Sequence, residues 1–318
     1  MIIVYILAAI LISGVLIAVH EFGHFAAAKL CGVRVNEFSI GMGPLIWHKE
    51  TAETQYSLRL LPIGGFCAME GEDEESGDER SLGRQGFFKK AVIFAAGSSG
   101  NFLGGSLIIR AEARGGGGYL TPEPAGTAPE FEQQNGQTLQ AGDIFYEING
   151  ERVYLYSDVS LLMSLHQGQP MDLVVLRDGE KVELNDITWG TYTGTEGETY
   201  QGYGIYIAGD QVEEANLWTL LKTSWLNTID FVRIVRLSLQ MLVTGQAGMD
   251  DLSGPVGIVS TITQVGTASE TFAAAVENIL YFGAMLAVNL AVMNLLPIPA
   301  LDGGKIFFLI IDEIAMKL

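Results

Sequence analysis

The sequence predicts a multi-pass α-helical membrane protein that carries two β-rich segments. Hydrophobic residues make up 48% of the 318-residue chain and charged residues only 17%, whereas soluble domains usually carry about 25% charged residues. The apolar residues gather in long uncharged stretches, which is typical of membrane-spanning helices. Between these stretches lie segments rich in glycine and alternating side chains, which favour short strands and turns.

Charge and cysteine content limit the function classes. The formal net charge is −19, and binding to phosphate backbones needs a basic surface, so nucleic acid is not an expected partner. The two cysteines, Cys31 and Cys67, are too few for a disulfide framework. We expect both to be free thiols without a catalytic role.

Residues 1–32 predict the first transmembrane helix. The first 19 residues carry no charged side chain, and at 1.5 Å per residue the stretch is long enough to cross a bilayer. It has neither a basic start nor a clear cleavage site, so we expect no cleavable signal. The positive-inside rule places the following segment in the cytoplasm and the N-terminus outside, because basic residues follow the helix closely: Lys29, Arg34, Lys49, Arg59, Arg80, Arg84, Lys89 and Lys90.

Residues 33–90 predict short β-hairpins followed by an acidic loop. Alternating or β-prone stretches at 33–35, 38–40 and 56–60 are separated by glycine and proline turns. We interpret the run of acidic residues between 70 and 79 as a solvated loop.

Residues 91–114 predict a second transmembrane helix, whose apolar character is weakened by several glycines. Gly97, Gly100, Gly104 and Gly105 indicate either close helix contact in the membrane or a marginal span. Four glycines at 115–118 follow and predict a flexible joint.

Residues 115–210 predict a β-rich domain. A strand ends at the Asn149-Gly150 turn, a short helix follows at 158–166, and Arg177-Asp178-Gly179-Glu180 predicts a hairpin. Residues 204–207 predict a closing strand.

The last third of the sequence, residues 214–318, again predicts helices. We favour an interfacial amphipathic helix over a span at 214–245, because Lys222, Asp230, Arg233 and Arg236 interrupt it. In the segment 246–318, residues 278–296 predict a third transmembrane helix that runs into a proline-broken stretch. Another apolar helix starts near Lys305, and because only about fourteen residues follow Gly304, we expect the fourth helix to be truncated or missing.

His20-Glu21-Phe22-Gly23-His24 is the candidate metal motif. An HExxH pattern on a helix places two imidazoles one turn apart on one face, which suits Zn²⁺, and the glutamate can act as general base on water. Three ionisable groups beside a membrane helix are costly unless they are paired or bound to metal.

Asp302 is the candidate third ligand. It follows the uncharged third span, where prolines prevent a regular helix. Irregular backbone at membrane depth is tolerated where it lines a cavity. Gly303 and Gly304 would let the backbone pass close to a metal ion.

These motifs together resemble the site-2 protease family, peptidase family M50. Asn294 to Gly303 is similar to its NxxPxPxLDG motif, and the HExxH matches in order. Residues 39–44 and 61–66 resemble its membrane re-entrant β-hairpin region, 119–208 its extracytoplasmic PDZ domain, and 253–258 a segment before the LDG span. Residues 97–101 depart from its Gly-Pro-x-x-Asn pattern. The order is closest to the bacterial RseP/RasP-type branch with one PDZ domain.

The resemblance implies a fold and a set of residue roles. The expected fold is a multi-pass α-helical membrane protein with a re-entrant β-hairpin region and an inserted, mostly β PDZ domain. His20, His24 and Asp302 would bind Zn²⁺, and Glu21 would be the general base. Asn294 would contact or position the substrate backbone. The hairpins that contain Gly41, Gly43, Gly64 and Gly65 would offer an edge strand to an unwound substrate.

The implied activity is intramembrane zinc proteolysis of single-pass membrane proteins, for example an anti-sigma factor or a remnant signal peptide. The PDZ domain would lie outside the cell and act as a size filter, a recognition module or a packing module. The active site would lie near the cytoplasmic side, in contact with membrane lipid. The alternative is a non-proteolytic PDZ-containing membrane adaptor. A metal transporter would need ionisable groups spread along a pathway, whereas here they concentrate at one point.

Overall fold

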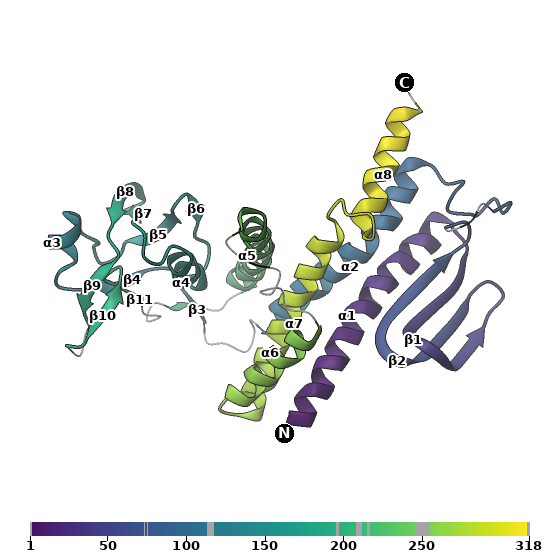
Figure 1. Cartoon of the computed structure of the whole chain (residues 1–318), viewed down its shortest axis with the longest axis horizontal. Helices are drawn as coiled ribbons and strands as arrows, with labels where there is room; N and C mark the ends of the chain where they lie inside the picture. Colours follow the sequence, from purple (N-terminus) through teal and green to yellow (C-terminus); the bar gives the residue numbers. More distant parts are fainter. Residues whose placement is uncertain are drawn as a thin grey trace. The chain divides into compact units, whose positions relative to one another are not determined.

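The computed structural model describes residues 2–72, 74, 76–112, 118–194, 197–207, 212–214, 217–245, 248 and 255–316. The chain forms two compact units. The first comprises Met1–Glu112 with Phe231–Leu318, and the second comprises Ala113–Asp230. Figure 1 colours the elements by their position in the sequence and labels most helices and strands.

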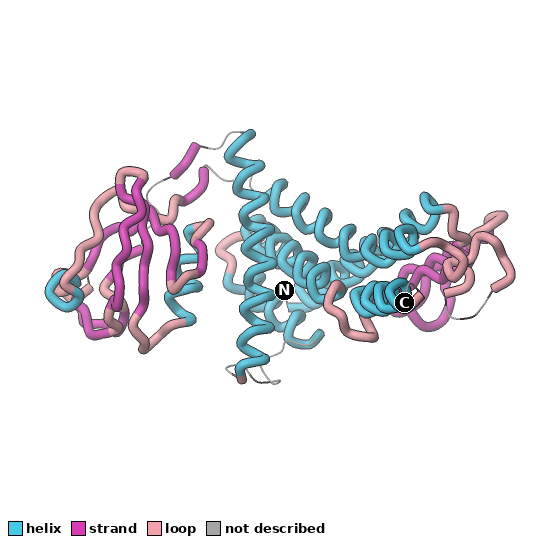
Figure 2. Tube along the Cα trace, turned by 90° about the horizontal axis from the view of Figure 1, so that it is seen from above, coloured by secondary structure: helices cyan, strands magenta, loops and turns pink. Residues whose placement is uncertain are grey.

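Apolar helices dominate the first unit, as Figure 2 shows in cyan. Within the described residues, three helices are long and apolar enough to cross a membrane, over Ile3–Cys31, Phe87–Ile109 and Phe272–Asn294, so the chain is a membrane protein. The helices of this unit are α1 (Ile2–Cys31), α2 (Phe87–Glu112), α6 (Pro255–Ala268), α7 (Phe272–Asn294) and α8 (Asp302–Ala315). Of the segment predicted at 253–258, Ser253 and Gly254 lie outside the described residues.

Glycines bring these helices into close contact. A Cβ at Gly100 of α2 would lie 3.1 Å from the carbonyl oxygen of Val19 in α1. On the opposite side of α2, a Cβ at Gly105 would lie 2.9 Å from the carbonyl oxygen of Ala284 in α7. Small residues let backbones approach this closely and gain van der Waals contact in a membrane. Of the two interpretations of the glycine-rich second span, close helix contact is therefore confirmed.

The β-structure of the first unit is one long hairpin folded over on itself, rather than the short hairpins that we predicted. Strands β1 (Val35–Glu50) and β2 (Gln55–Met69) pair with each other. Ile40 pairs with Gly65 on one side and Leu58 on the other. The register therefore places four segments side by side, each antiparallel to its neighbour, in the order 65–69, 35–40, 55–58 and 47–50. The fold-over occurs near Gly41 and Gly43, whose φ angles of 84° and 81° suit glycine.

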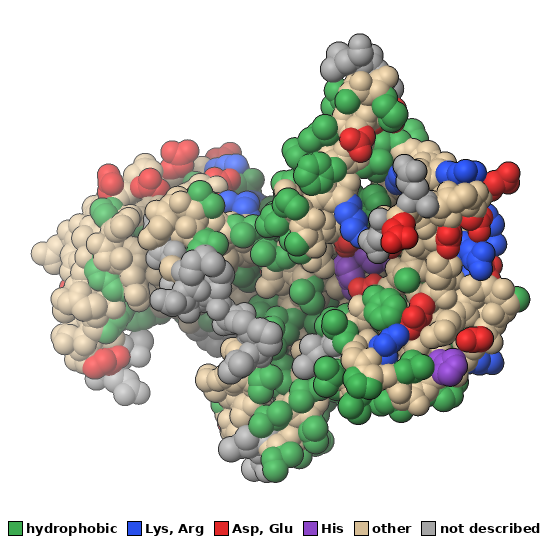
Figure 3. Space-filling model, turned by 45° about the vertical axis from the view of Figure 1, so that its right-hand side comes forward, with side chains coloured by type: hydrophobic (Ala, Val, Ile, Leu, Met, Phe, Trp, Pro, Cys, Tyr) green, Lys and Arg blue, Asp and Glu red, His purple; other side chains and the backbone are tan. Residues whose placement is uncertain are grey.

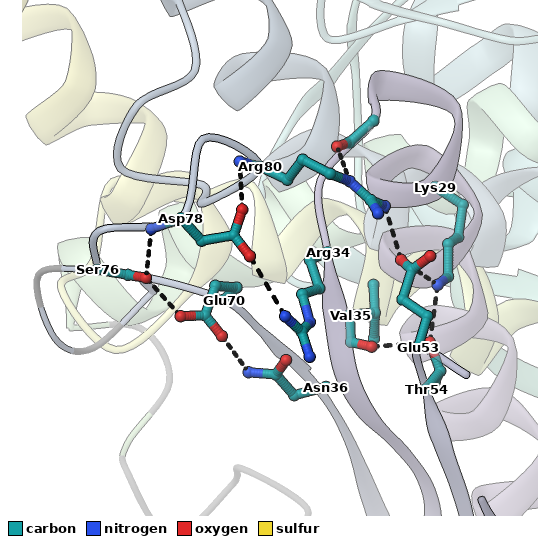
Figure 4. Close-up of polar contacts among 11 residues, drawn as sticks. Lys29, Arg34, Val35, Asn36, Glu53, Thr54, Glu70, Ser76, Asp78 and Arg80 are labelled. Atoms are coloured by element: carbon teal, nitrogen blue, oxygen red, sulfur yellow. Dashed lines mark hydrogen bonds and ion pairs between the residues drawn. The ribbon is translucent and has the colours of Figure 1, made fainter. Parts of the chain in front are cut away.

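A polar cluster joins the turn between β1 and β2 to the end of α1 and to the loop before α2 (Figure 4). Glu53 accepts hydrogen bonds from Lys29 and Arg80, both at 2.7 Å. Glu70 accepts one from Asn36 at 2.8 Å, and Asp78 pairs with Arg34 at 3.3 Å. The predicted loop at 70–79 is confirmed, with Glu74 and Glu79 exposed, but two of its carboxylates are not simply solvated, because Glu70 bonds to Asn36 of β1 and Asp78 to Arg34 just before it.

The C-terminal helix starts earlier than predicted. We expected it to begin near Lys305, but α8 begins at Asp302, with Leu301 as its extended N-cap residue. The difference arises because Gly303 and Gly304 fit a first turn that packs against the proline-broken segment. A Cβ at either position would collide with backbone carbonyl groups between Leu295 and Ile298.

The second unit is β-rich, as predicted. Its central sheet has the order β6-β5-β7-β8, and β4 pairs with β11. The Asn149-Gly150 turn has φ angles of 47° and 77°, and the predicted hairpin at 177–180 joins β7 to β8. The elements are β3 (Gly118–Leu120), β4 (Pro124–Thr127), α3 (Phe131–Asn135), β5 (Ile144–Ile148), β6 (Glu151–Arg152), α4 (Tyr156–Leu165), β7 (Met171–Arg177), β8 (Glu180–Ile187), β9 (Gly190–Thr193), β10 (Thr199–Gly202), β11 (Ile205–Ile207) and β12 (Val212–Glu214).

This second unit has its own apolar core. Phe131, Phe145, Leu162 and Leu173 are each at most 1% exposed, which is expected of a domain that folds around its own centre. Helix α5 (Leu217–Thr244) follows, and its sequence begins in the second unit and ends in the first. It is not among the candidate spans found in the described residues. Its predicted place at the membrane interface stays a prediction. The predicted joint at 115–118 lies outside the described residues except for Gly118.

Candidate metal centre

Helix α1 supplies the two imidazoles. His20 and His24 are four residues apart, so their side chains stack on one helix face. Their ring centroids are 4.8 Å apart, and their Nε2 atoms are 3.2 Å apart. Both Nε2 atoms therefore point toward the same small volume.

Asp302 brings a carboxylate to this volume from the other end of the chain. Its Oδ2 atom lies 3.1 Å from His20 Nε2 and 3.2 Å from His24 Nε2. The side chain is 13% exposed. The first turn of α8 holds it there, after the break that follows α7.

The three atoms fit a zinc ion. Zn–N and Zn–O distances of about 2.0–2.1 Å place tetrahedral ligands roughly 3.3 Å apart, and the three separations here are 3.1, 3.2 and 3.2 Å. Within the described part of the chain, no aligned hydrogen-bond donor reaches the buried Oδ2 atom of Asp302. A buried carboxylate oxygen needs a partner, and a cation between the three groups would supply one.

A second contact orients the His24 ring. His24 Nδ1 lies 2.8 Å from the carbonyl oxygen of Ile93 in α2. A carbonyl oxygen only accepts, so Nδ1 carries the proton and Nε2 keeps its lone pair for a metal. Gly97, one turn further along α2, lies directly against both imidazoles. A Cβ at this position would be 2.7 Å from His20 Cε1 and closer still to His24.

Glu21 lies in the same cavity as the three ligand candidates. The cavity has a volume of about 400 Å³, and Figure 3 shows histidine side chains recessed beside acidic and basic ones. Strand β2 forms one wall, and a Cβ at Gly65 would be 3.3 Å from Glu21 Cγ. The lining residues are His20, Glu21, His24, Phe66, Cys67, Ala68, Met69, Glu72, Phe94, Asp302 and Lys305.

The structure thus brings four predicted site residues together and leaves others apart. Asn294 is the last residue of α7 and does not line this cavity. Gly41, Gly43 and Gly64 shape the fold-over of the hairpin through positive φ angles. Their predicted contact with substrate stays a prediction.

Sequence reasoning missed Glu72 and Lys305. Lys305 Nζ lies 2.6 Å from Glu72 Oε1, and both side chains line the cavity. The spacing of Lys305 from Asp302 is a signal that could have found it, since residues three apart share a helix face. Cys67 also lines the cavity, and burial raises the pKa of its thiol to about 12. It therefore stays protonated and unreactive.

The chain matches known proteins over almost its whole length. The sequence profile of Peptidase family M50 matches residues 8–318. "Putative zinc metalloprotease CPE1693" of Clostridium perfringens is 35% identical, over 98% of this chain and 89% of that protein. "Regulator of sigma-W protease RasP" of Bacillus subtilis is 27% identical, over 98% of this chain and 90% of that protein.

The apolar helices, the HExxH pair and the third carboxylate define a membrane-embedded metallohydrolase. The chain belongs to Peptidase family M50 and is a site-2-type zinc metalloprotease.

Proposed function

We propose that this protease cuts single-pass membrane proteins within their transmembrane segments. The observation that carries the proposal is the position of the metal centre. Its histidines lie in the apolar helix α1, and its carboxylate follows the apolar helix α7. A peptide bond in a membrane segment can reach this site without leaving the bilayer.

The four residues have complementary roles in the proposed reaction. His20, His24 and Asp302 would hold Zn²⁺, which when bound supplies a Lewis acid for water and for the peptide carbonyl. Glu21 accepts a proton from water as the water oxygen attacks the carbonyl carbon. It then delivers this proton to the nitrogen that leaves.

The hairpin would bind the substrate as an added strand. A helical peptide bond is shielded, so the substrate must unwind before it is cut. The segment 65–69 pairs on one side with residues 35–40, and Phe66 to Met69 line the cavity. Among the described strands none pairs with its other edge, so this edge can accept an extended substrate. Asn294 would help to position that strand.

The likeness to RasP supports a substrate class and a topology. The printed name of that relative connects it to the regulation of sigma-W. We infer that this chain acts on an anti-sigma factor or a remnant signal peptide. The second unit would be a PDZ domain outside the cell that filters or recognises substrates. The metal centre would face the cytoplasmic side.

The test is cleavage of a model single-pass substrate in proteoliposomes. Wild-type protein is expected to cut within the transmembrane segment, and Glu21→Gln is expected to lose at least about 100-fold in rate, because the general base is gone. Glu50→Gln changes an exposed glutamate of β1 and is the matched control. Equal cleavage by wild type and Glu21→Gln would contradict the proposal and favour a non-proteolytic adaptor.

A further inference from the structure

Lys305 brings an amine group to the cavity of the metal centre. It lies one helical turn after Asp302 on α8, so both side chains point to one face. Its Nζ donates a hydrogen bond to Glu72 Oε1 at 2.6 Å and lies 5.6 Å from the centroid of the Phe94 ring. Among the described residues that line the cavity, it is the only lysine or arginine.

The ion pair between Lys305 and Glu72 is partly exposed to solvent. The Lys305 side chain is 45% exposed and that of Glu72 is 20% exposed. A pair this exposed usually contributes only about 0–1 kcal/mol to stability. Lysine carries its charge on a flexible four-carbon stem, so Nζ can leave Glu72 for another acceptor in the cavity.

The charge balance of the cavity shows which acceptor suits it. Glu21, Glu72 and Asp302 contribute three carboxyl groups to the lining, and a bound Zn²⁺ would offset two of their charges, so one negative charge remains before Lys305 is counted. During peptide hydrolysis a further negative charge develops on the carbonyl oxygen of the bond being cut. Carboxylates repel that charge, whereas a cation within hydrogen-bond reach stabilises it.

We propose that Lys305 is a catalytic residue that donates a hydrogen bond to the carbonyl oxygen of the scissile peptide bond, with Glu72 holding it between turnovers. The proposal rests on the proposed function. As the water oxygen bonds to the carbonyl carbon, the π electrons of C=O move to the carbonyl oxygen, and Lys305 contacts it. These electrons then re-form C=O while the C–N bond breaks and the nitrogen takes the proton held by Glu21.

The experiment measures kcat, KM and zinc content of full-length variants with the model substrate. Lys305→Met keeps the length of the side chain but removes the charge, and kcat is expected to fall about 100- to 1,000-fold. KM should change less than about threefold, and zinc per chain should match wild type. The kcat of Lys305→Arg should be at least about tenfold higher than that of Lys305→Met. Lys181→Met, which removes a lysine 3.9 Å from Glu147 in the second unit, is the matched control.

Two further readouts separate catalysis from a structural role. A phosphinic peptide mimics the tetrahedral geometry of the reaction, so Lys305→Met should weaken its binding by about the same factor as kcat. Glu72→Gln keeps Lys305, so its kcat should be at least about tenfold higher than that of Lys305→Met. Equal losses in these two variants, or loss of zinc from Lys305→Met, would overturn the inference.

The control with Glu21→Gln keeps the two proposals distinguishable. Full activity of Lys305→Met beside an inactive Glu21→Gln overturns only the role of Lys305. Full activity of Glu21→Gln overturns both.

Discussion

Gly97 of α2 lies against the imidazole of His24 with no room for a side chain between them. The backbone of α2 therefore forms the wall behind the histidine pair, and the neighbouring carbonyl of Ile93 holds His24 Nδ1. Helix packing and metal geometry depend on one another at this point.

Gly97→Ala is expected to lower zinc affinity at least about tenfold, because the added methyl group must displace a ligand ring or separate α1 from α2. Zinc titration of the purified protein measures this. Gly104→Ala is the matched control on the same helix, since its Cβ would meet Val19 at an ordinary 3.7 Å. Equal zinc affinity of wild type and Gly97→Ala would show that the packing here is loose.

Gly65→Ala is expected to lower kcat about tenfold or more with little change in zinc content. The methyl group would lie 2.9 Å from the carbonyl oxygen of Ser39 and 3.3 Å from Glu21 Cγ, so the general base would shift by some tenths of an ångström. Gly77→Ala, in a loop with open space around its Cβ, is the control. An unchanged kcat for Gly65→Ala would contradict this placement of Glu21.

The sequence was sufficient to predict that His20, His24 and Asp302 could share one metal ion and that a helix carries the two histidines, but not that Asp302 opens the first turn of α8. HExxH spacing depends only on helix periodicity, and Asp302 follows an uncharged span and precedes two glycines. The pairing of Ile40 with both Gly65 and Leu58 could not be predicted, because alternation of residues does not reveal that a strand folds back on itself.

Long-range polar pairs were also beyond prediction. Glu72 belongs to a run of acidic residues that looks solvated, and Lys305 looks like the start of a helix. Their contact joins positions 233 residues apart, so only the folded chain brings them together. The same holds for Glu53, whose partners come from α1 and from the loop before α2.

The stability of the hairpin is expected to depend on acid pH through Glu53. Hydrogen bonds and charge from Lys29 and then Arg80 lower the pKa of Glu53 from 4.5 to about 2. Because the pKa is lower in the folded state, the ionised Glu53 stabilises the fold. This stabilisation is complete above about pH 4.5 and is lost as the pH falls through about 2. Glu53→Gln should therefore be less stable than wild type at pH 6, and the difference should shrink between pH 4.5 and 2.

Hydrogen exchange of residues 51–56 at several pH values measures this difference. Glu50→Gln, at the exposed end of β1, is the control and should follow wild type. A constant difference between Glu53→Gln and wild type from pH 6 to 2 would contradict the assignment.

Asp143→Ala is expected to destabilise the second unit by about 2 kcal/mol, since it removes the charge-assisted hydrogen bonds between the buried carboxylate and Arg177. Asp143 is fully buried and accepts two hydrogen bonds from Arg177, both at 2.8 Å. Burial alone would raise the pKa of Asp143, but Arg177 and the N–H of Gln140 outweigh it and hold the pKa below its ordinary value. This stabilisation is present above about pH 4 and is lost as pH falls further.

Hydrogen exchange of β5 and β7 in the full-length chain tests this stability. Lys181→Met, which removes a more exposed ion pair, should change protection by less than about 1 kcal/mol. Unchanged protection in Asp143→Ala would show that the pair with Arg177 contributes nothing to the domain.

Zinc content per chain, measured by mass spectrometry on purified wild type and Asp302→Ala, tests the central claim most directly. We predict about one zinc per wild-type chain and less than about 0.1 for Asp302→Ala after dialysis, because one of three protein ligands is lost. Asp312→Ala, an exposed position of the same helix, should retain wild-type zinc. Equal zinc in wild type and Asp302→Ala would contradict the metal centre of His20, His24 and Asp302.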